Sequence, residues 1–423
     1  MTCQGCGNHQ RGFTLIELMI SATLFLLLSL AIFGILASSE GQKRITTSVN
    51  DIDRNGNYVL LRLGDLIRSA GAGYSAKSIA PTGSGVPADY VRSFGCKLNS
   101  GTVLPPPAAL PKPFNNITTT NIRLAPVIIV ANGSNLTSTA TPGNTSDILV
   151  VMSSTAGFAQ TGIPFTSAAS GSTLNLLNSI GIYPNDWLLI ADAQGGNCQV
   201  GQVAATFTAA TSTSASAPAV PMTAGTPSLA SYTSNSIVFD LGNVTDNHPP
   251  SFMMFGVGTD YTTASTSAIG RALYGYDLLN AASTTPDLIA EGVYELHALY
   301  GVDTTAVTAP PGNGTVNAWV DPSVTTPADY TAAKLLDGST ASTNKLLSIK
   351  AIRLGLVMRA PLAEKANITT VDTASGVMTL FPDLTDVSGT SLAHKVDLTD
   401  TNYGQNYRWR VFEETIALHN PLD

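Results

Sequence analysis

The chain has 423 residues, enough for one large domain or two ordinary ones, and a formal net charge of −8. Only 12% of its residues are Asp, Glu, Lys or Arg, so Ser, Thr, Asn and backbone groups supply much of the polar surface. An acidic chain with few basic clusters lacks the positive footprint of a non-specific nucleic-acid-binding protein, so we expect no nucleic-acid partner.

The first predicted element is a membrane-spanning helix at residues 18–37. The stretch from Leu18 to Ala37 carries no charged side chain and is mostly apolar. A helix of this length spans about 30 Å, the thickness of the hydrocarbon core of a bilayer. It is longer than the apolar part of a secretory signal, and no A-x-A cleavage site follows it. We therefore expect a single-pass membrane anchor.

Glu17 stands directly before this apolar run. An ionisable side chain is costly at the edge of a membrane segment and marks a candidate functional residue. The simpler alternative is that the side chain of Glu17 extends to the lipid headgroups.

The residues around Glu17 form a recognisable signal. Residues 11–19 read Arg-Gly-Phe-Thr-Leu-Ile-Glu-Leu-Met. This segment resembles the class III signal of type IV prepilins and type II secretion pseudopilins. The resemblance implies that residues 1–12 are a leader, that the prepilin peptidase cuts between Gly12 and Phe13, and that Phe13 is N-methylated. Glu17 then occupies the fifth position of the mature chain, where that family has a glutamate.

The resemblance also implies a role for Glu17 in filament assembly. Cleavage leaves a positive amine on Phe13, which enters the apolar core of a filament. Burying one charge alone costs several kcal/mol, and an opposite charge offsets much of that cost. We expect the carboxylate of Glu17 to pair with the Phe13 amine of an adjoining subunit, with no part in catalysis.

The helix is predicted to continue past the membrane, over residues 13–71. Apolar residues recur at helical spacings of three, four and seven, namely Ile45, Val49, Ile52, Val59, Leu63, Leu66 and Ala70. Gly71 and Gly73 supply a stop signal. A helix from Phe13 to Ala70 would be about 87 Å long.

The remainder, residues 72–423, is predicted to be a β-rich head. Residues 75–145 and 204–236 are rich in Ser, Thr, Pro and Ala or Asn, and we expect surface loops there without a packed core of their own. Strand-like runs occur at residues 148–152, 187–190, 237–239, 352–358 and 407–418. The last two alternate apolar and polar residues, which predicts an antiparallel sheet with one covered face.

Two segments of the head resemble the PilW family of minor pilins. Residues 291–303 match its G-V-x-x-L-x-x-x-Y-G-x-D segment, and residues 407–421 resemble its C-terminal ending. The simplest structural interpretation of the first segment is a buried strand ending in a turn at Asp303. The resemblance covers about residues 11–74 and 237–421, so residues 237–423 would be the PilW-like core. Residues 75–236 form a poorly recognisable, insert-rich region.

The resemblance implies an α+β, pilin-like fold, in which the long helix packs on an antiparallel sheet head with long loop insertions. It implies a minor pilin that helps prime type IV pilus assembly and is incorporated near the pilus tip. The implied partners are other minor pilins, the major pilin, the prepilin peptidase, the inner-membrane assembly platform and a tip adhesin. The chain would lie in the bacterial inner membrane with its head in the periplasm, and on the pilus and cell surface after assembly.

Two alternatives remain open at this point. The first is a J-type minor pseudopilin of a type II secretion system, which has a similar architecture. The second is a surface adhesive module carried on a pilin stalk, with residues 75–236 binding a ligand.

Four cysteines divide into two pairs along the chain. Cys96 and Cys198 fall in the head, where an oxidising compartment favours one bridge over two separate thiols. A loop of about 100 residues closed in this way contributes up to about 4.7 kcal/mol on the chain-entropy model. Cys3 and Cys6, with His9, form a weak zinc pattern within the leader.

We expect no metal, no cofactor and no catalytic residue. Residues 51–56 copy half of an EF-hand loop, but Arg62 stands where the bidentate glutamate belongs. The sequence contains no H-E-x-x-H, G-x-S-x-G or G-x-x-x-x-G-K-[ST] motif. The five histidines are scattered without ligand spacing, so an enzyme displayed on a fibre has no candidate residues.

Overall fold

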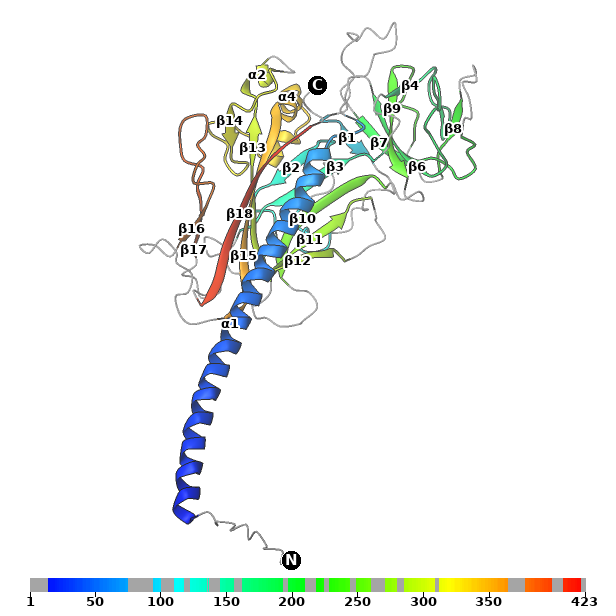
Figure 1. Ribbon diagram of the computed structural model, residues 1–423. Coiled ribbons are helices and arrows are strands. Elements are labelled where there is room, and N and C mark those ends of the chain that lie inside the picture. Colours follow the sequence, from blue (N-terminus) through cyan, green and yellow to red (C-terminus); the bar gives the residue numbers. More distant parts are fainter. Residues whose placement is uncertain are drawn as a thin grey trace, which may run out of the picture. The chain divides into compact units, whose positions relative to one another are not determined.

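The computed structural model describes residues 14–74, 94–99, 110–117, 122–134, 136, 145–155, 162–192, 197–209, 218–223, 228–243, 249–259, 271–279, 285–308, 312–363, 377–397 and 406–419. The chain divides into two compact units, Met1–Asp51 and Ile52–Asp423. Helix α1 (Leu15–Ser69) belongs to the first unit up to Asp51 and to the second unit from Ile52 onward (Figure 1). The predicted long N-terminal helix is confirmed.

From Ile52 onward, one face of α1 is buried. Its buried apolar side chains are each at most 2% exposed and belong to the main hydrophobic core, namely Ile52, Val59, Leu63, Ile67 and Ala70. Their spacings of three, four and seven residues keep them on one side of a helix with 3.6 residues per turn. The head therefore covers this face, as the apolar pattern predicts.

The helix ends at the glycines that the sequence marks as a stop. Gly71 and Gly73 both have φ of 82°, a conformation that disfavours residues with a Cβ. The Gly71 N–H donates to the carbonyl of Met152 at 2.9 Å, and a Cβ on Gly73 would lie 2.4 Å from that of Ser154. The chain therefore turns here against the strand that contains Met152.

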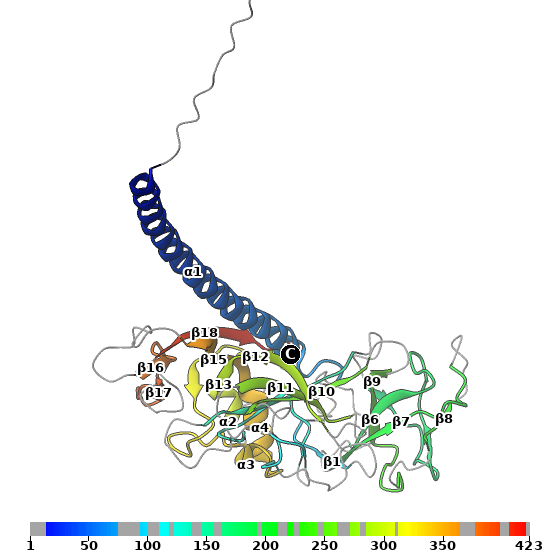
Figure 2. The same ribbon diagram turned by 90° about the horizontal axis from the view of Figure 1, so that it is seen from below.

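The C-terminal sheet is four-stranded and antiparallel, in the order β14-β13-β15-β18. Its strands are β14 (Ala318–Val320), β13 (Val293–Val302), β15 (Ile349–Ala363) and β18 (Tyr407–Ala417). From Ile52 onward, helix α1 lies along β18 (Figures 1 and 2). At Gly56 the helix approaches Phe412 so closely that an added Cβ would lie 2.5 Å from its ring.

A second sheet is five-stranded, in the order β12-β11-β10-β3-β2. Its strands are β12 (Asp287–Glu291), β11 (Arg271–Asp277), β10 (Ser251–Thr259), β3 (Ile148–Ser153) and β2 (Val127–Val130), all antiparallel. The Ile129 N–H of this sheet donates to the hydroxyl of Tyr300 on β13 at 2.6 Å. The two sheets thus share the main core and a buried hydrogen bond.

The third sheet follows the order β1-β7-β6-β9-β4. Its strands are β1 (Lys97–Asn99), β7 (Asn197–Gln202), β6 (Asp186–Asp192), β9 (Ser236–Asn243) and β4 (Ile163–Pro164), and β1 pairs with β7 in parallel. A two-stranded ribbon, β5 (Thr173–Asn175) with β8 (Ala219–Pro221), lies beyond it. The side chains of β6 alternate: Leu189 and Ala191 join the main core, and Leu188 and Ile190 join a second one.

That second core corrects one expectation. Residues 204–236 were expected to be surface loops without a packed core, yet Val220, Met222, Leu229 and Tyr232 are at most 4% exposed within it. These apolar residues are separated by Ser, Thr, Ala, Gly and Pro, and no single strand or helix period is sustained over all four of them. Each residue is an isolated apolar side chain that packs into the second core, and a search for periodic apolar residues does not detect such positions.

The C-terminal sheet corrects another expectation, because both of its faces are covered. Leu354 and Leu356 lie in the main core, whereas Leu299, Val357 and Trp409 form a third cluster on the opposite face. A hairpin of β16 (Val377–Leu380) and β17 (His394–Asp397) covers that face. Gly355 makes room for it, since a Cβ there would lie 2.7 Å from the ring of Phe381.

Strand β13 confirms the prediction of a buried strand ending in a turn. All ten of its residues are buried. Asp303 follows it with no exposed surface and accepts hydrogen bonds from the backbone of Thr305, Asn313 and Gly314 at 2.8–3.0 Å. Burial opposes ionisation, but these hydrogen bonds and that of the Thr305 hydroxyl outweigh it and lower the pKa of Asp303. The short helices α2 (Thr304–Thr308), α3 (Ala332–Leu335) and α4 (Thr340–Ser348) follow.

Candidate functional site

The first part of α1 presents an apolar surface that the rest of the chain does not cover. Its large apolar side chains from Leu15 to Leu36 are 55–79% exposed. Among the described residues, α1 is the one helix long and apolar enough to cross a membrane. The helix thus presents a surface suited to lipid or to neighbouring helices.

Glu17 lies in the first turn of α1, exposed to solvent. The Glu17 N–H donates to the hydroxyl oxygen of Thr14 at 3.4 Å, and the Thr14 hydroxyl lies 3.5 Å from the Glu17 carboxylate. A threonine followed three residues later by a glutamate is the capping-box spacing. A carboxylate also favours the positive end of the helix. Glu17 therefore has a local role in starting the helix that the sequence interpretation overlooked, although the Thr-x-x-Glu spacing was visible. Gly12 and Phe13 lie outside the described residues.

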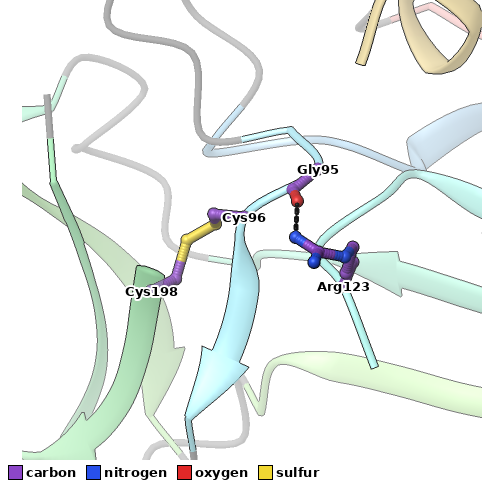
Figure 3. Close-up of a disulfide and its surroundings, with 4 residues drawn as sticks. All are labelled: Gly95, Cys96, Arg123 and Cys198. Carbon is purple, nitrogen blue, oxygen red and sulfur yellow. Dashed lines mark hydrogen bonds between the residues drawn. A yellow bond between two sulfur atoms is a disulfide. The ribbon is translucent and has the colours of Figure 1, made fainter. Parts of the chain in front are cut away.

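Cys96 and Cys198 are joined by a disulfide in the structure (Figure 3), with their Cα atoms 5.6 Å apart. Cys96 directly precedes β1, and Cys198 pairs with Leu98 in the parallel ladder of β1 and β7. Next to the bridge, Nη1 of Arg123 donates to the carbonyl of Gly95 at 2.7 Å, and its Nε donates to that of Leu336 at 2.7 Å. The disulfide and Arg123 together fix the short strand β1.

The structure brings together two of the scattered histidines. His297 on β13 and His394 at the start of β17 stack with ring centroids 3.8 Å apart. Glu295, two residues before His297, lies 3.3 Å from Nε2 of His297 and 3.7 Å from Nε2 of His394. The carboxylate of Asp147 lies 3.5 Å from Nδ1 of His297. Glu295, His297 and His394 are a group that could hold a metal ion.

Two buried carboxylates flank His297 in this group. Asp147, Glu295 and His297 are 4%, 0% and 6% exposed. Burial opposes the charging of His297, but Asp147 and Glu295 outweigh it and raise the pKa of its imidazole to about 10. The sequence interpretation missed this group because its histidines are 97 residues apart and only the docked hairpin brings them together.

Among the described residues, His419 is the one remaining histidine, and it is not part of this group. His419 lies exposed beyond β18, whereas His9 and His248 lie outside the described residues.

Two family models match parts of the chain. Residues 255–420 match the family described as Type IV Pilus-assembly protein W, and residues 7–33 match the Prokaryotic N-terminal methylation motif. The first match runs from within β10 to the end of the C-terminal sheet, and the second includes Gly12, Phe13 and Glu17. No curated protein and no solved structure matches the chain.

These matches agree with the architecture. The motif at residues 7–33 and the apolar first part of α1 together indicate membrane anchoring. The matched region of the head contains the sheet against which the second part of α1 packs. A long apolar helix, an α+β head and both family matches support a PilW-like type IV minor pilin.

Proposed function

We propose that this pilin helps to prime type IV pilus assembly and enters the pilus near its tip. The observation that carries the proposal is the prepilin motif on a helix whose apolar surface is uncovered from Leu15 to Leu36. A surface of this size requires lipid or neighbouring subunits as cover. The pilin family itself points to a structural protein rather than an enzyme.

The processing step in this proposal removes residues 1–12. The prepilin peptidase cuts between Gly12 and Phe13 and N-methylates Phe13, leaving a mature chain with helix residues 13–71 and a head of residues 72–423. The membrane segment 18–37 then holds the head in the periplasm until assembly. The match over residues 7–33 supports this step, since it spans the proposed cleavage site.

The assembly step depends on Glu17. Its exposed carboxylate lies one helical turn from the proposed new N-terminus and is available to a neighbour. In the apolar interior of a filament, an unpaired carboxylate or amine is costly, and the two charges together offset much of that cost. We propose that Glu17 pairs with the Phe13 amine of the adjoining subunit and so sets the register of docking.

Intact mass of the protein purified from its native membrane tests the processing step. We expect wild type to lack residues 1–12 and to carry one added methyl group, and Gly12→Ala to remain uncut. An uncut wild-type chain would refute the processing step and leave an ordinary membrane-anchored protein.

The assembly step is tested with Glu17→Gln and a matched control, Glu40→Gln. Glu40 is on the same helix but in an exposed pair with Arg44, 3.8 Å apart. We expect both variants to be processed, with Glu17→Gln absent from the sheared pilus fraction and Glu40→Gln present. Wild-type amounts of Glu17→Gln in pili would contradict the role of Glu17.

A deletion strain that keeps its pili but loses protein secretion would favour the J-type pseudopilin.

A second candidate function is a surface adhesive module. The observation in its favour is the separate core around β5, β6 and β8, beside which Leu177, Ile180 and Tyr183 are 58%, 53% and 49% exposed. Neither family match reaches this region. Replacing these three side chains with Ser should reduce adhesion without changing pilus number, and unchanged adhesion would exclude these side chains as the binding surface.

A further inference from the structure

The group formed by Glu295, His297 and His394 has the geometry of a metal site. Glu295 and His297 are alternate residues of β13, so their side chains emerge on the same face of the sheet. Hairpin β16–β17 covers that face and supplies His394, whose register partner on β16 is Leu380. The three residues therefore come from two elements that approach each other only in the folded head.

Two of the separations between ligand atoms are close to those of a tetrahedral transition-metal site. In a tetrahedral zinc site the bonds to His and Glu are about 2.0–2.1 Å, so the ligand atoms lie about 3.3–3.4 Å apart. Here the Glu295 oxygen lies 3.3 Å from Nε2 of His297 and 3.7 Å from Nε2 of His394. All three ligand atoms lie within 4.8 Å of one another. For all three to reach coordination distance, the ligand atoms have to approach one another and the two stacked imidazoles have to turn apart.

Asp147 is placed as an outer partner of this group. Its Oδ2 lies 3.5 Å from Nδ1 of His297, the nitrogen that faces away from Glu295. The Asp147 carboxylate is held in place by the Ala298 N–H at 3.0 Å and the Asn132 N–H at 2.9 Å. A carboxylate on the far nitrogen of a ligating histidine is the usual support in zinc sites, because it fixes the ring and raises its basicity.

Charge and hydrogen bonding favour a cation at this place. Asp147 and Glu295 are two buried carboxylates, and a divalent ion balances both without a proton on either imidazole. Nε2 of His394 is a buried atom with no hydrogen-bond partner among the described residues. A buried nitrogen lone pair without a donor is a ready metal ligand.

We propose that Glu295, His297 and His394 bind one divalent transition-metal ion, and that zinc suits this ligand set best. The His394 side chain is 32% exposed, which gives the ion a route from solvent and leaves the fourth position to water. The ion ties hairpin β16–β17 to strand β13 and so fixes the cover on the second face of the C-terminal sheet.

Metal binding by the full-length chain in detergent tests the proposal. The chain carries Cys3→Ser and Cys6→Ser, because that pair could bind zinc independently. After removal of metal with a chelator and addition of zinc, we expect one tightly bound ion per chain and a higher Tm. His394→Ala should lose both, whereas the matched control His419→Ala, an exposed histidine outside the group, should keep both. Asp147→Asn should bind about 10–100-fold more weakly.

A spectroscopic measurement tests the same site without any substitution in the proposed ligands. Cobalt(II) is added to the chain that carries only Cys3→Ser and Cys6→Ser, in which Glu295, His297 and His394 are unchanged. We expect the intense visible bands of a tetrahedral cobalt site, and we expect zinc to abolish these bands by displacing the cobalt. Absence of both stoichiometric zinc and these bands would refute the site and leave His297 as a cation between two carboxylates. Unchanged zinc content in a folded His394→Ala chain would refute it equally.

Discussion

Helix α1 contains two stretches with similar apolar side chains, which are exposed in the first stretch and buried in the second. From Leu15 to Leu36 the large apolar side chains are 55–79% exposed, whereas Val59, Leu63 and Ile67 have no exposed surface. The head covers the second stretch within the same chain, and the first stretch needs cover from lipid or from other subunits. Apolar residues in a helix are therefore buried within the chain only where another part of the same chain, here the head, packs against them.

The largest effect that would test this comparison comes from shortening one leucine in each stretch. Leu63→Ala removes buried contacts and should lower the free energy of unfolding by about 2–5 kcal/mol. Leu28, which is 63% exposed, should tolerate the same change without effect on the head. Denaturant unfolding followed by tryptophan fluorescence measures both, because Trp187, Trp319 and Trp409 all lie in the second unit. Equal effects would contradict the division.

A glycine in each stretch gives a smaller contrast. At Gly56 an added Cβ would lie 2.5 Å from the ring of Phe412, whereas at Gly34 nothing lies within 4 Å. Gly56→Ala should destabilise the head by about 1–3 kcal/mol through overpacking. Gly34→Ala should leave head unfolding unchanged while favouring helix in the exposed stretch. A stable Gly56→Ala head would show that α1 and β18 are not closely packed.

Ion pairs give the smallest contrast. Arg68 lies 2.6 Å from Glu414 of β18, with side chains 38% and 30% exposed, whereas Arg44 and Glu40 are 3.8 Å apart and 72% and 65% exposed. A double-mutant cycle on Arg68 and Glu414 should give a coupling of about 0.5–1 kcal/mol in head unfolding. The same cycle on Arg44 and Glu40 should give none. A coupling near zero for both pairs would mean that the closer pair is screened by solvent.

The sequence predicts the parts of this fold that are local. The apolar run of residues 18–37, the buried stripe that includes Val59 and Leu63, and the stop at Gly71 all follow from spacings of a few residues. The alternation in residues 352–358 predicts strand β15 for the same reason. The prepilin segment around Glu17 is likewise contiguous, which is why a short motif was sufficient to identify it.

The parts that escaped prediction depend on contacts between distant residues. The second core takes Val220 and Tyr232 from a Ser- and Thr-rich stretch without a regular apolar period. The cover on the second face of the C-terminal sheet depends on Gly355, whose missing side chain admits Phe381. The stacking of His297 on His394 follows from that docking. No short-range pattern encodes these pairings.

The pairing of α1 with β18 has a consequence for biosynthesis. Gly56 and Phe412 are made 356 residues apart, so at roughly 5–20 residues per second the packing partner of α1 is absent for about 20–70 s after the helix is synthesised. During that interval the stripe containing Val59 and Leu63 has no partner from β18. The head sheet closes only after the last strand has been translated. A chain truncated before Tyr407 would therefore keep the apolar stretch that indicates membrane anchoring and yet lack that cover.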